Sequence, residues 1–232
     1  NQLPLAIFGI AMGIVLLPGL SKAIKNDNKK EINDTQNRSL EFALLISLPS
    51  AVGLYILSTP IIHILFERGA FLAEDTLYTA QVLSIFSLGL PAYILIKILV
   101  TCFFAREDTK TPLYVAVVSV IINVVLSLLL ISTMREMGIA LATAISAWVN
   151  AFLLFIILQF KKNLILDAIF LKNSFKILIS VLVMLSGCYV LNEIVFADLS
   201  NSDFSIKLGG LLLIIICCKI IYLTMIFMLK VL

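Results

Sequence analysis

Apolar residues occur in long blocks along the chain, and short polar segments separate the blocks. The hydrocarbon core of a bilayer is about 30 Å thick, so a helix needs about 20 mostly apolar residues to cross it. Seven blocks approach or exceed that length: Leu3–Leu20, Leu40–Leu57, Leu77–Phe104, Pro112–Ile131, Gly138–Phe160, Phe175–Phe196 and Ile206–Leu229. Backbone polar groups must be paired within lipid, so blocks of this length are expected to be helices. The pattern therefore predicts an all-α polytopic membrane protein with seven transmembrane helices.

The composition agrees with this pattern. Of the 232 residues, 61% are hydrophobic and 13% are charged, and the mean hydropathy is +1.11. A soluble globular domain is about 45–50% apolar and about 25% charged. These values exclude a soluble enzyme and a nucleic-acid-binding protein. They direct the search for function to the few polar groups inside the spans.

Positive charge is distributed unevenly between the two sets of alternate connections. Of the 17 Lys and Arg residues, twelve fall on one side of the predicted membrane and three, Arg68, Arg135 and Lys207, fall on the other. The remaining two, Lys97 and Lys219, lie inside spans. Short loops rich in Lys and Arg stay in the cytoplasm. We therefore expect the amino end on the periplasmic side and the carboxyl end in the cytoplasm.

Three connecting segments and the first residue suggest how the chain is organised. Ser21–Ser39 is predicted to be a solvated cytoplasmic connection, either without regular structure or with a short interfacial helix. The short apolar stretch Pro60–Phe66 is predicted to lie flat in the outer interface. The basic segment Lys161–Ser174 is the internal boundary, which separates residues 1–160, with five spans, from residues 161–232, with two. Because the chain opens at Asn1 directly on an apolar block, we expect it to be part of a longer protein.

The third, fourth and fifth spans each carry polar residues about one helical turn apart, broadly on one face. These stripes favour either hydrogen bonds between helices or a water-accessible cavity. Their members are Gln81, Ser84, Ser87, Lys97 and Thr101, then Ser119, Asn123 and Ser127, then Thr143, Ser146 and Asn150. We assign Ser84, Ser87, Thr101 and Asn150, with Lys97, to a candidate substrate cavity.

Lys97 is the most informative of these residues. It lies nine residues before Arg106, which places it about 13 Å from the cytoplasmic edge at 1.5 Å per residue. A lysine that faces lipid at the bilayer centre costs at least about 2.5–3.5 kcal/mol. It therefore either faces a cavity where it meets an anionic substrate or snorkels to the interface as a structural residue.

Other classes of membrane protein receive little support from the residues. Lys219, in the last of seven helices, is typical of retinal proteins, but a Schiff-base lysine needs a buried carboxylate, and Glu41 at a span end is the nearest candidate. The four cysteines match neither a metal site nor a disulfide framework. No catalytic grouping is present, so we do not expect an enzyme. His63 has no partner that the sequence identifies, so we expect an exposed interfacial residue, with a proton relay as the alternative.

Several segments resemble the MurJ (MviN) family of lipid II flippases, which belongs to the MOP exporter superfamily. The most specific is the aromatic pair, Ala-Arg and Asp-Thr-Lys-Thr-Pro of Phe103–Pro112, between two spans. The other matching segments are Leu3–Gly13, Leu17–Lys22, Leu48–Ala51 and Leu65–Phe71. The resemblance runs in register from residue 3 to about residue 160, and it rests on hydropathy beyond that point.

The resemblance implies a fold and a function. Family members have fourteen helices in two lobes around a central cavity, and they move lipid II, the lipid-linked peptidoglycan precursor, between the leaflets of the bacterial inner membrane by alternating access. This chain looks like helices eight to fourteen, which is the carboxyl-terminal lobe. Residues 161–232 would then supply the groove for the lipid tail. The implied partners are membrane lipids, lipid II and the missing amino-terminal lobe, without nucleic acid.

The resemblance also assigns roles to residues. Lys97 matches a basic position of the tenth family helix, and Arg106, Asp108, Lys110, Thr111 and Pro112 match the cytoplasmic loop motif. Asn123 and Thr143 fit a sodium site found in some members, although Ser127 stands where that site has a carboxylate; no other cofactor is expected. Two alternatives to a flippase lobe stay open. In the first, the chain is a non-transporting fragment or split subunit that only packs with a partner lobe. In the second, it is part of an exporter with a different cargo.

Overall fold

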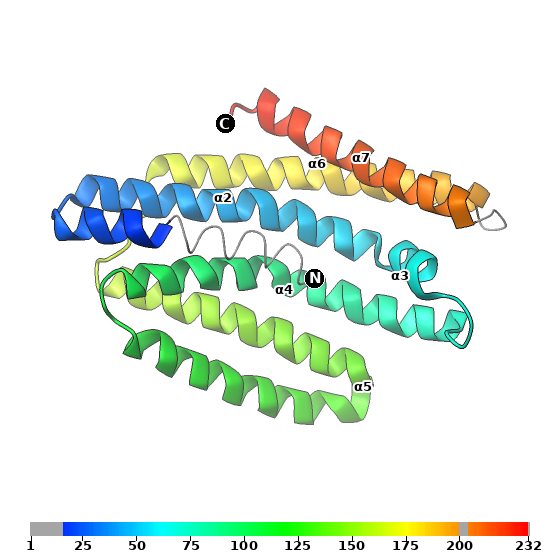
Figure 1. Cartoon of the computed structure of the whole chain (residues 1–232), viewed down its shortest axis with the longest axis horizontal. Coiled ribbons are helices and arrows are strands. Elements are labelled where there is room, and N and C mark those ends of the chain that lie inside the picture. The colour runs from blue at the N-terminus through cyan, green and yellow to red at the C-terminus, as the bar shows by residue number, and fades with distance from the viewer. Residues whose placement is uncertain (1–15, 200–203, 232) are drawn as a thin grey trace.

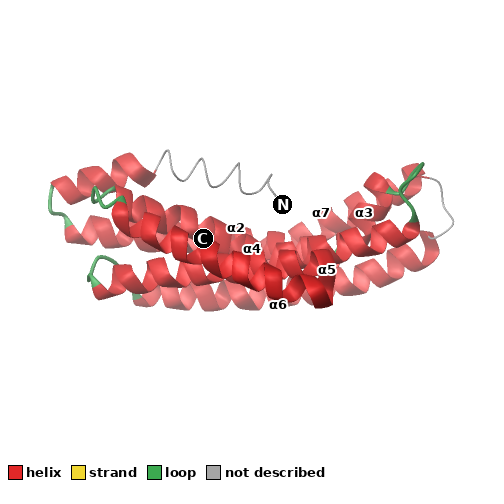
Figure 2. Cartoon of the chain, turned by 90° about the horizontal axis from the view of Figure 1, so that it is seen from below, coloured by secondary structure: helices red, strands yellow, loops and turns green. Residues whose placement is uncertain are grey.

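The computed structural model describes residues 16–199 and 204–231, and the regular elements in these two ranges are helices (Figure 2). Residues 16–25 are helical. The helices that follow are α2 (Lys29–Ile56), α3 (Ser58–Phe66), α4 (Ala73–Phe104), α5 (Lys110–Phe160), α6 (Ala168–Leu199) and α7 (Phe204–Met228) (Figure 1). The all-helical prediction is therefore confirmed for this part of the chain.

Five of these helices, α2, α4, α5, α6 and α7, are long and apolar enough to cross a membrane. They coincide with six of the seven predicted spans, because α5 covers two of them. Most of the first predicted span, Leu3–Leu20, lies outside the described residues. The structure thus shows helices at six of the seven predicted spans. The number of membrane crossings remains a prediction.

α5 is a helical hairpin. Arg135, with φ 50° and ψ −131°, reverses the chain between two antiparallel arms (Figure 1). The arms are in contact well beyond the turn, because Asn123 Nδ2 donates hydrogen bonds to Thr143 Oγ1 at 3.2 Å and Ser146 Oγ at 3.0 Å. A Cβ on Gly138 would lie 2.7 Å from the carbonyl oxygen of Leu130, so this crossing requires a glycine.

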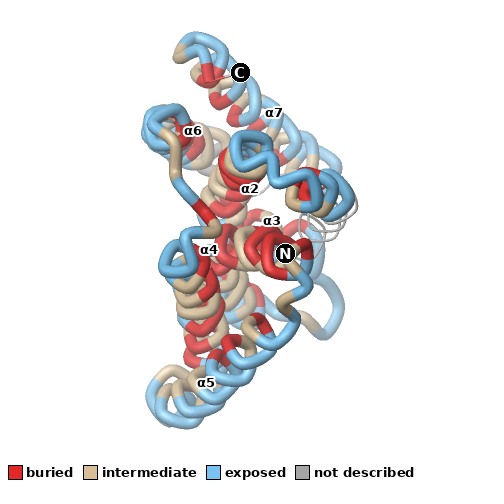
Figure 3. Tube along the Cα trace, turned by 90° about the vertical axis from the view of Figure 1, so that its left-hand side faces the viewer, coloured by how far each residue is buried: buried red, intermediate tan, exposed pale blue. Residues whose placement is uncertain are grey.

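α2 occupies the middle of the molecule. On one side it packs against α4, which packs in turn against α5; on the other side it packs against α6, which packs against α7 (Figures 1 and 3). α3 contacts α4 and α7. Buried positions lie where neighbouring helices face each other, whereas the outward faces carry exposed apolar side chains such as Leu113, Leu128 and Leu182. Such outward faces are typical of helices surrounded by lipid.

The predicted polar connection Ser21–Ser39 is wrong over most of its length. Only residues 26–28 separate the helix at 16–25 from α2. The side chain of Asn28 accepts a hydrogen bond from the backbone N–H of Glu31 at 3.2 Å, which caps the amino end of α2. Hydropathy missed this start because the first turns of α2 are polar. The connection Lys161–Ser174 is also shorter than predicted, since α6 begins at Ala168.

Candidate functional site

The hydroxyl groups of α4 bond to their own helix. Ser84 Oγ donates to the carbonyl oxygen of Gln81 at 2.8 Å, and Ser87 Oγ donates to that of Ser84 at 2.6 Å. Thr101 Oγ1 donates to the carbonyl oxygen of Lys97 at 2.8 Å. Ser and Thr in helix interiors commonly bond to a carbonyl of the preceding turn in this way. These side chains therefore satisfy their hydrogen bonds without a second helix, and whether they line a cavity stays a prediction.

Lys97 lies on α4 with an exposed side chain. The residues on either side of it, Ile96 and Ile98, belong to or pack against a buried apolar cluster shared by α2 and α4. Lys97 thus projects away from that cluster. Asn150 is the one residue of the candidate substrate cavity that does not lie on α4. It is half-buried on the second arm of α5. The described contacts do not join Lys97 and Asn150 into one site.

The fourth and fifth predicted spans do share a polar cluster. Besides the bonds of Asn123 to Thr143 and Ser146, Ser127 Oγ donates to Asn123 Oδ1 at 3.4 Å. Of the two interpretations of the polar stripes, hydrogen bonds between helices describe Asn123, Thr143 and Ser146. All the oxygen atoms in the cluster are neutral, whereas hard cations prefer sites with several oxygens and usually a carboxylate. The candidate sodium residues are therefore close together, and the fit to Na⁺ is incomplete.

The loop motif forms a well-ordered cap at the start of α5. Asp108 Oδ1 accepts the backbone N–H of Thr111 at 3.0 Å, and Asp108 Oδ2 accepts the Thr111 hydroxyl at 2.7 Å. Lys161, beyond the far end of the hairpin, forms an ion pair with Asp108 Oδ2 at 2.7 Å. These three hydrogen bonds, with that from Lys161 first, lower the pKa of Asp108 to about 2. Lys110 is exposed and Pro112 is buried in the first turn of α5.

Arg106 closes the end of α4. Its Nη1 donates to the carbonyl oxygen of Cys102 at 2.9 Å, and its Nη2 donates to that of Asn163 at 2.8 Å. The negative end of the helix dipole also stabilises a cation at this position. Burial lowers the pKa of the Arg106 guanidinium. Arg106 and Asp108 thus hold the 105–109 connection against the 161–167 connection.

A second polar network links α2 to the start of α6 at the same end of the bundle. Arg38 forms an ion pair with Asp167 at 2.7 Å, and Asn37 Nδ2 donates to the carbonyl oxygen of Ile165 at 2.8 Å. Glu41, which is only 7% exposed, accepts a hydrogen bond from Asn173 Nδ2 at 2.5 Å and pairs with Arg38. Sequence reasoning missed this network because its partners are about 130 residues apart. The one local signal was Asp167, whose side chain caps α6.

His63 is neither fully exposed nor without a partner, so that prediction is wrong. Its Nδ1 lies 2.8 Å from Glu67 Oε2, and its Nε2 lies 3.3 Å from Lys207 Nζ on α7. Thr76 Oγ1 donates to the same Glu67 oxygen at 2.6 Å. The hydrogen bonds from Thr76 and His63 lower the pKa of Glu67. This cluster joins α3, α4 and α7 at the end of the bundle opposite to the loop motif.

This chain is similar to proteins of one known family. Residues 1–208 match the family model described as lipid II flippase MurJ. The chain belongs to this family. The protein named "Probable lipid II flippase MurJ" in Rhizobium tropici is 43% identical over 223 residues, which cover 95% of this chain and 42% of that protein. Its namesake in Rickettsia prowazekii is 46% identical over 154 residues, covering 66% of this chain and 30% of that protein. The chain therefore spans less than half the length of these relatives.

Membership in the lipid II flippase MurJ family makes this chain part of an integral membrane transporter family. Residues 103–112, which the sequence pattern singled out, lie at the junction of α4, α5 and the 161–167 connection. The motif residues thus contact one another and residues that follow α5. Lys97 on α4 and Asn150 on α5 make no described contact with that junction.

Proposed function

We propose that this chain is the carboxyl-terminal lobe of a flippase that moves lipid II across the bacterial inner membrane by alternating access. The observation that carries the proposal is the family match over residues 1–208 of a chain whose helices are long and apolar enough to span a membrane. The relatives are more than twice as long as the part they share with this chain, which leaves room for an amino-terminal lobe. The basic connections would face the cytoplasm.

Within this proposal, Lys97 attracts the anionic head of the lipid into the cavity between the lobes. Its side chain is exposed on α4, so a second lobe can approach it. The Arg106–Asp108–Lys161 junction braces the cytoplasmic ends of α4 and α5. The membrane potential, worth about 2.3 kcal/mol per charge per 100 mV, is the proposed source of energy. A sodium ion at Asn123 and Thr143 is a secondary proposal, since the cluster supplies only neutral oxygens.

The role of Lys97 is tested in the full-length protein, in cells depleted of their own flippase. We expect Lys97→Ala to abolish most growth at normal protein levels, because the cavity loses its deep positive charge, and Lys97→Arg to restore growth. Lys219→Ala, which removes an exposed lysine of α7, serves as the control and should grow normally. Normal growth of the Lys97→Ala strain would remove this residue from the mechanism.

Complementation also separates the proposal from its alternatives. The full-length gene should rescue depleted cells, and this chain alone should not, because it lacks the first lobe. Rescue by the chain alone would contradict the two-lobe proposal. Failure of the full-length gene despite normal expression would favour a non-transporting relative or an exporter with a different cargo.

A further inference from the structure

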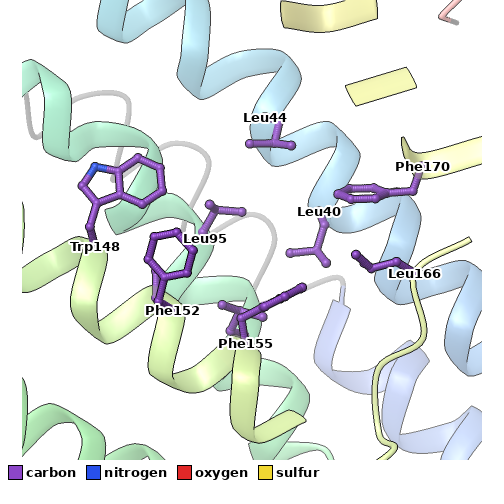
Figure 4. Close-up of a pocket in the computed structure, with 10 residues that line it drawn as sticks. Leu40, Leu44, Leu95, Trp148, Phe152, Phe155, Leu166 and Phe170 are labelled. Carbon is purple, nitrogen blue, oxygen red and sulfur yellow. The ribbon is translucent and has the colours of Figure 1, made fainter. Parts of the chain in front are cut away.

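An apolar groove lies between α2, α4 and the second arm of α5, and the connection before α6 closes one end of it (Figure 4). Its volume is about 190 Å³. The lining residues are Leu40, Leu44, Leu95, Leu99, Trp148, Ala151, Phe152, Phe155, Leu166 and Phe170. α2, α4 and α5 supply most of this lining; Phe170, in the first turn of α6, is the α6 residue in it, and none of the lining residues named above comes from α7.

The lining determines what chemistry the apolar groove accepts. Trp148 supplies the one side-chain nitrogen in the lining, and that nitrogen donates to the carbonyl oxygen of Leu88 at 3.0 Å. Every remaining lining side chain is apolar. A dry apolar cavity of about 150 Å³ takes up a benzene-sized molecule. The groove is thus large enough for a stretch of hydrocarbon chain, and a sugar or peptide head group would lose its hydrogen bonds there.

The apolar groove runs from the middle of the bundle towards its basic end. Trp148, Ala151 and Phe155 follow one face of the α5 arm, over about 10 Å at 1.5 Å per residue. Leu166 and Phe170 lie at the other end, beside the 161–167 connection (Figure 4). A chain lying in the groove would therefore place its polar end at that connection.

The connection and the start of α6 together carry the positive charge that a lipid phosphate requires. Residues 161–176 contain four lysines and one acid, Asp167. Lys161 pairs with Asp108, and Lys176 Nζ donates to the carbonyl oxygen of Lys230 at 2.9 Å. Lys162 and Lys172 are exposed, and in the described part of the chain they make no side-chain hydrogen bond or ion pair. Basic residues at the membrane surface attract anionic lipids.

We propose that the apolar groove binds one acyl chain of an anionic phospholipid of the inner leaflet, with the lipid phosphate near Lys162. The site lies mainly between α2, α4 and α5, whereas the sequence assigned the lipid-tail groove to residues 161–232. The proposal does not depend on lipid II transport, so either can fail without the other.

Trp148 is the sole tryptophan of this chain and lies in the groove, which makes it a direct reporter. The full-length protein, with Trp148 as its single tryptophan, is placed in phosphatidylcholine vesicles that contain a minor fraction of lipid brominated on its acyl chains. Brominated phosphatidylglycerol should quench Trp148 with saturation, at roughly fivefold lower mole fraction than brominated phosphatidylcholine, which is the fold-change expected from one basic contact. Equal quenching by the two lipids in proportion to mole fraction, or no quenching by either, would overturn the proposal.

Two variants locate the site. Leu44→Phe fills part of the groove and should reduce quenching by brominated phosphatidylglycerol. Leu182→Phe, at a 62% exposed position of α6 outside the groove, should not. Lys162→Gln should lower the apparent affinity for phosphatidylglycerol to that for phosphatidylcholine. If Leu44→Phe does not fold, the comparison of the two lipids on the unsubstituted protein still decides the matter; unchanged quenching in a folded Leu44→Phe protein would contradict the groove assignment.

Discussion

At the scale of single residues, Asp108 joins two ends of the α5 hairpin. It caps the first turn through Thr111 and pairs with Lys161 beyond the last turn. We expect Asp108→Ala to lower the stability of the full-length protein by about 1 kcal/mol, the usual effect of losing an amino-terminal cap. Asp108→Asn keeps an acceptor for the Thr111 N–H and should lose less. Thermal unfolding of the purified protein measures both, and a larger loss in Asp108→Asn would contradict the capping role.

Asp108 also predicts how stability depends on pH. Its pKa is about 2 in the folded protein, below the usual value of about 3.9 for an aspartate in an unfolded chain. A lowered folded pKa means that this contribution is fully present above about pH 4 and is lost as the pH falls towards 2. The side chain is 24% exposed, so we expect solvent to screen the effect in part. Unfolding midpoints measured between pH 5 and 2 should fall less steeply in Asp108→Asn than in the unsubstituted protein.

At the scale of elements, the α5 hairpin depends on one close approach between its arms. A Cβ on Gly138 would meet the backbone of Leu130 at 2.7 Å, and backbone cannot move aside as a flexible side chain does. We expect Gly138→Ala to destabilise the protein by about 1–3 kcal/mol. Gly209→Ala on α7, where nothing lies within 4 Å of the added carbon, is the matched control and should be within about 0.5 kcal/mol of neutral. Equal thermal unfolding midpoints for the two variants would contradict the close approach of the two arms at Gly138.

The elements also show what sequence could and could not predict. Apolar blocks predicted the positions of α4, α6, α7 and both arms of α5, because burial in lipid and helix formation select the same residues. The start of α2 at Lys29 escaped prediction because a cap, not hydropathy, sets it. The motif at residues 103–112 drew attention to Arg106 and Asp108, but it did not predict that Asn163 and Lys161 would be their partners. Partners distant in the sequence leave no local pattern.

At the scale of the whole molecule, α6 and α7 join the remainder mainly through α2. Besides the Arg38–Asp167 and Glu41–Asn173 contacts, Tyr222 Oη donates to the carbonyl oxygen of Leu45 at 2.6 Å. Asn173→Ala takes a hydrogen bond from a buried carboxylate, which costs about 1–3 kcal/mol. We expect this change to loosen the start of α6 and to speed tryptic cleavage after Lys161 and Lys162.

The control for this experiment is Ser186→Ala, at an exposed serine of α6 whose hydroxyl donates to the carbonyl oxygen of Val183 in its own helix. Its cleavage rate should match that of the unsubstituted full-length protein. A cleavage rate of Asn173→Ala equal to that of the control would mean that apolar packing alone docks α6 and α7 on α2.

The order of helices in space differs from their order in the chain, and this has a consequence for synthesis. Glu41 meets Asn173 only after a further 132 residues have been made. At about 5–20 residues per second, the ribosome needs roughly 7–26 s to produce them. During that interval the side of α2 that will pack against α6 has no helical neighbour. The carboxylate of Glu41 on that side lacks its hydrogen bond from Asn173. A nascent chain stalled before residue 173 should therefore be the stage at which membrane chaperones and proteases bind it most strongly.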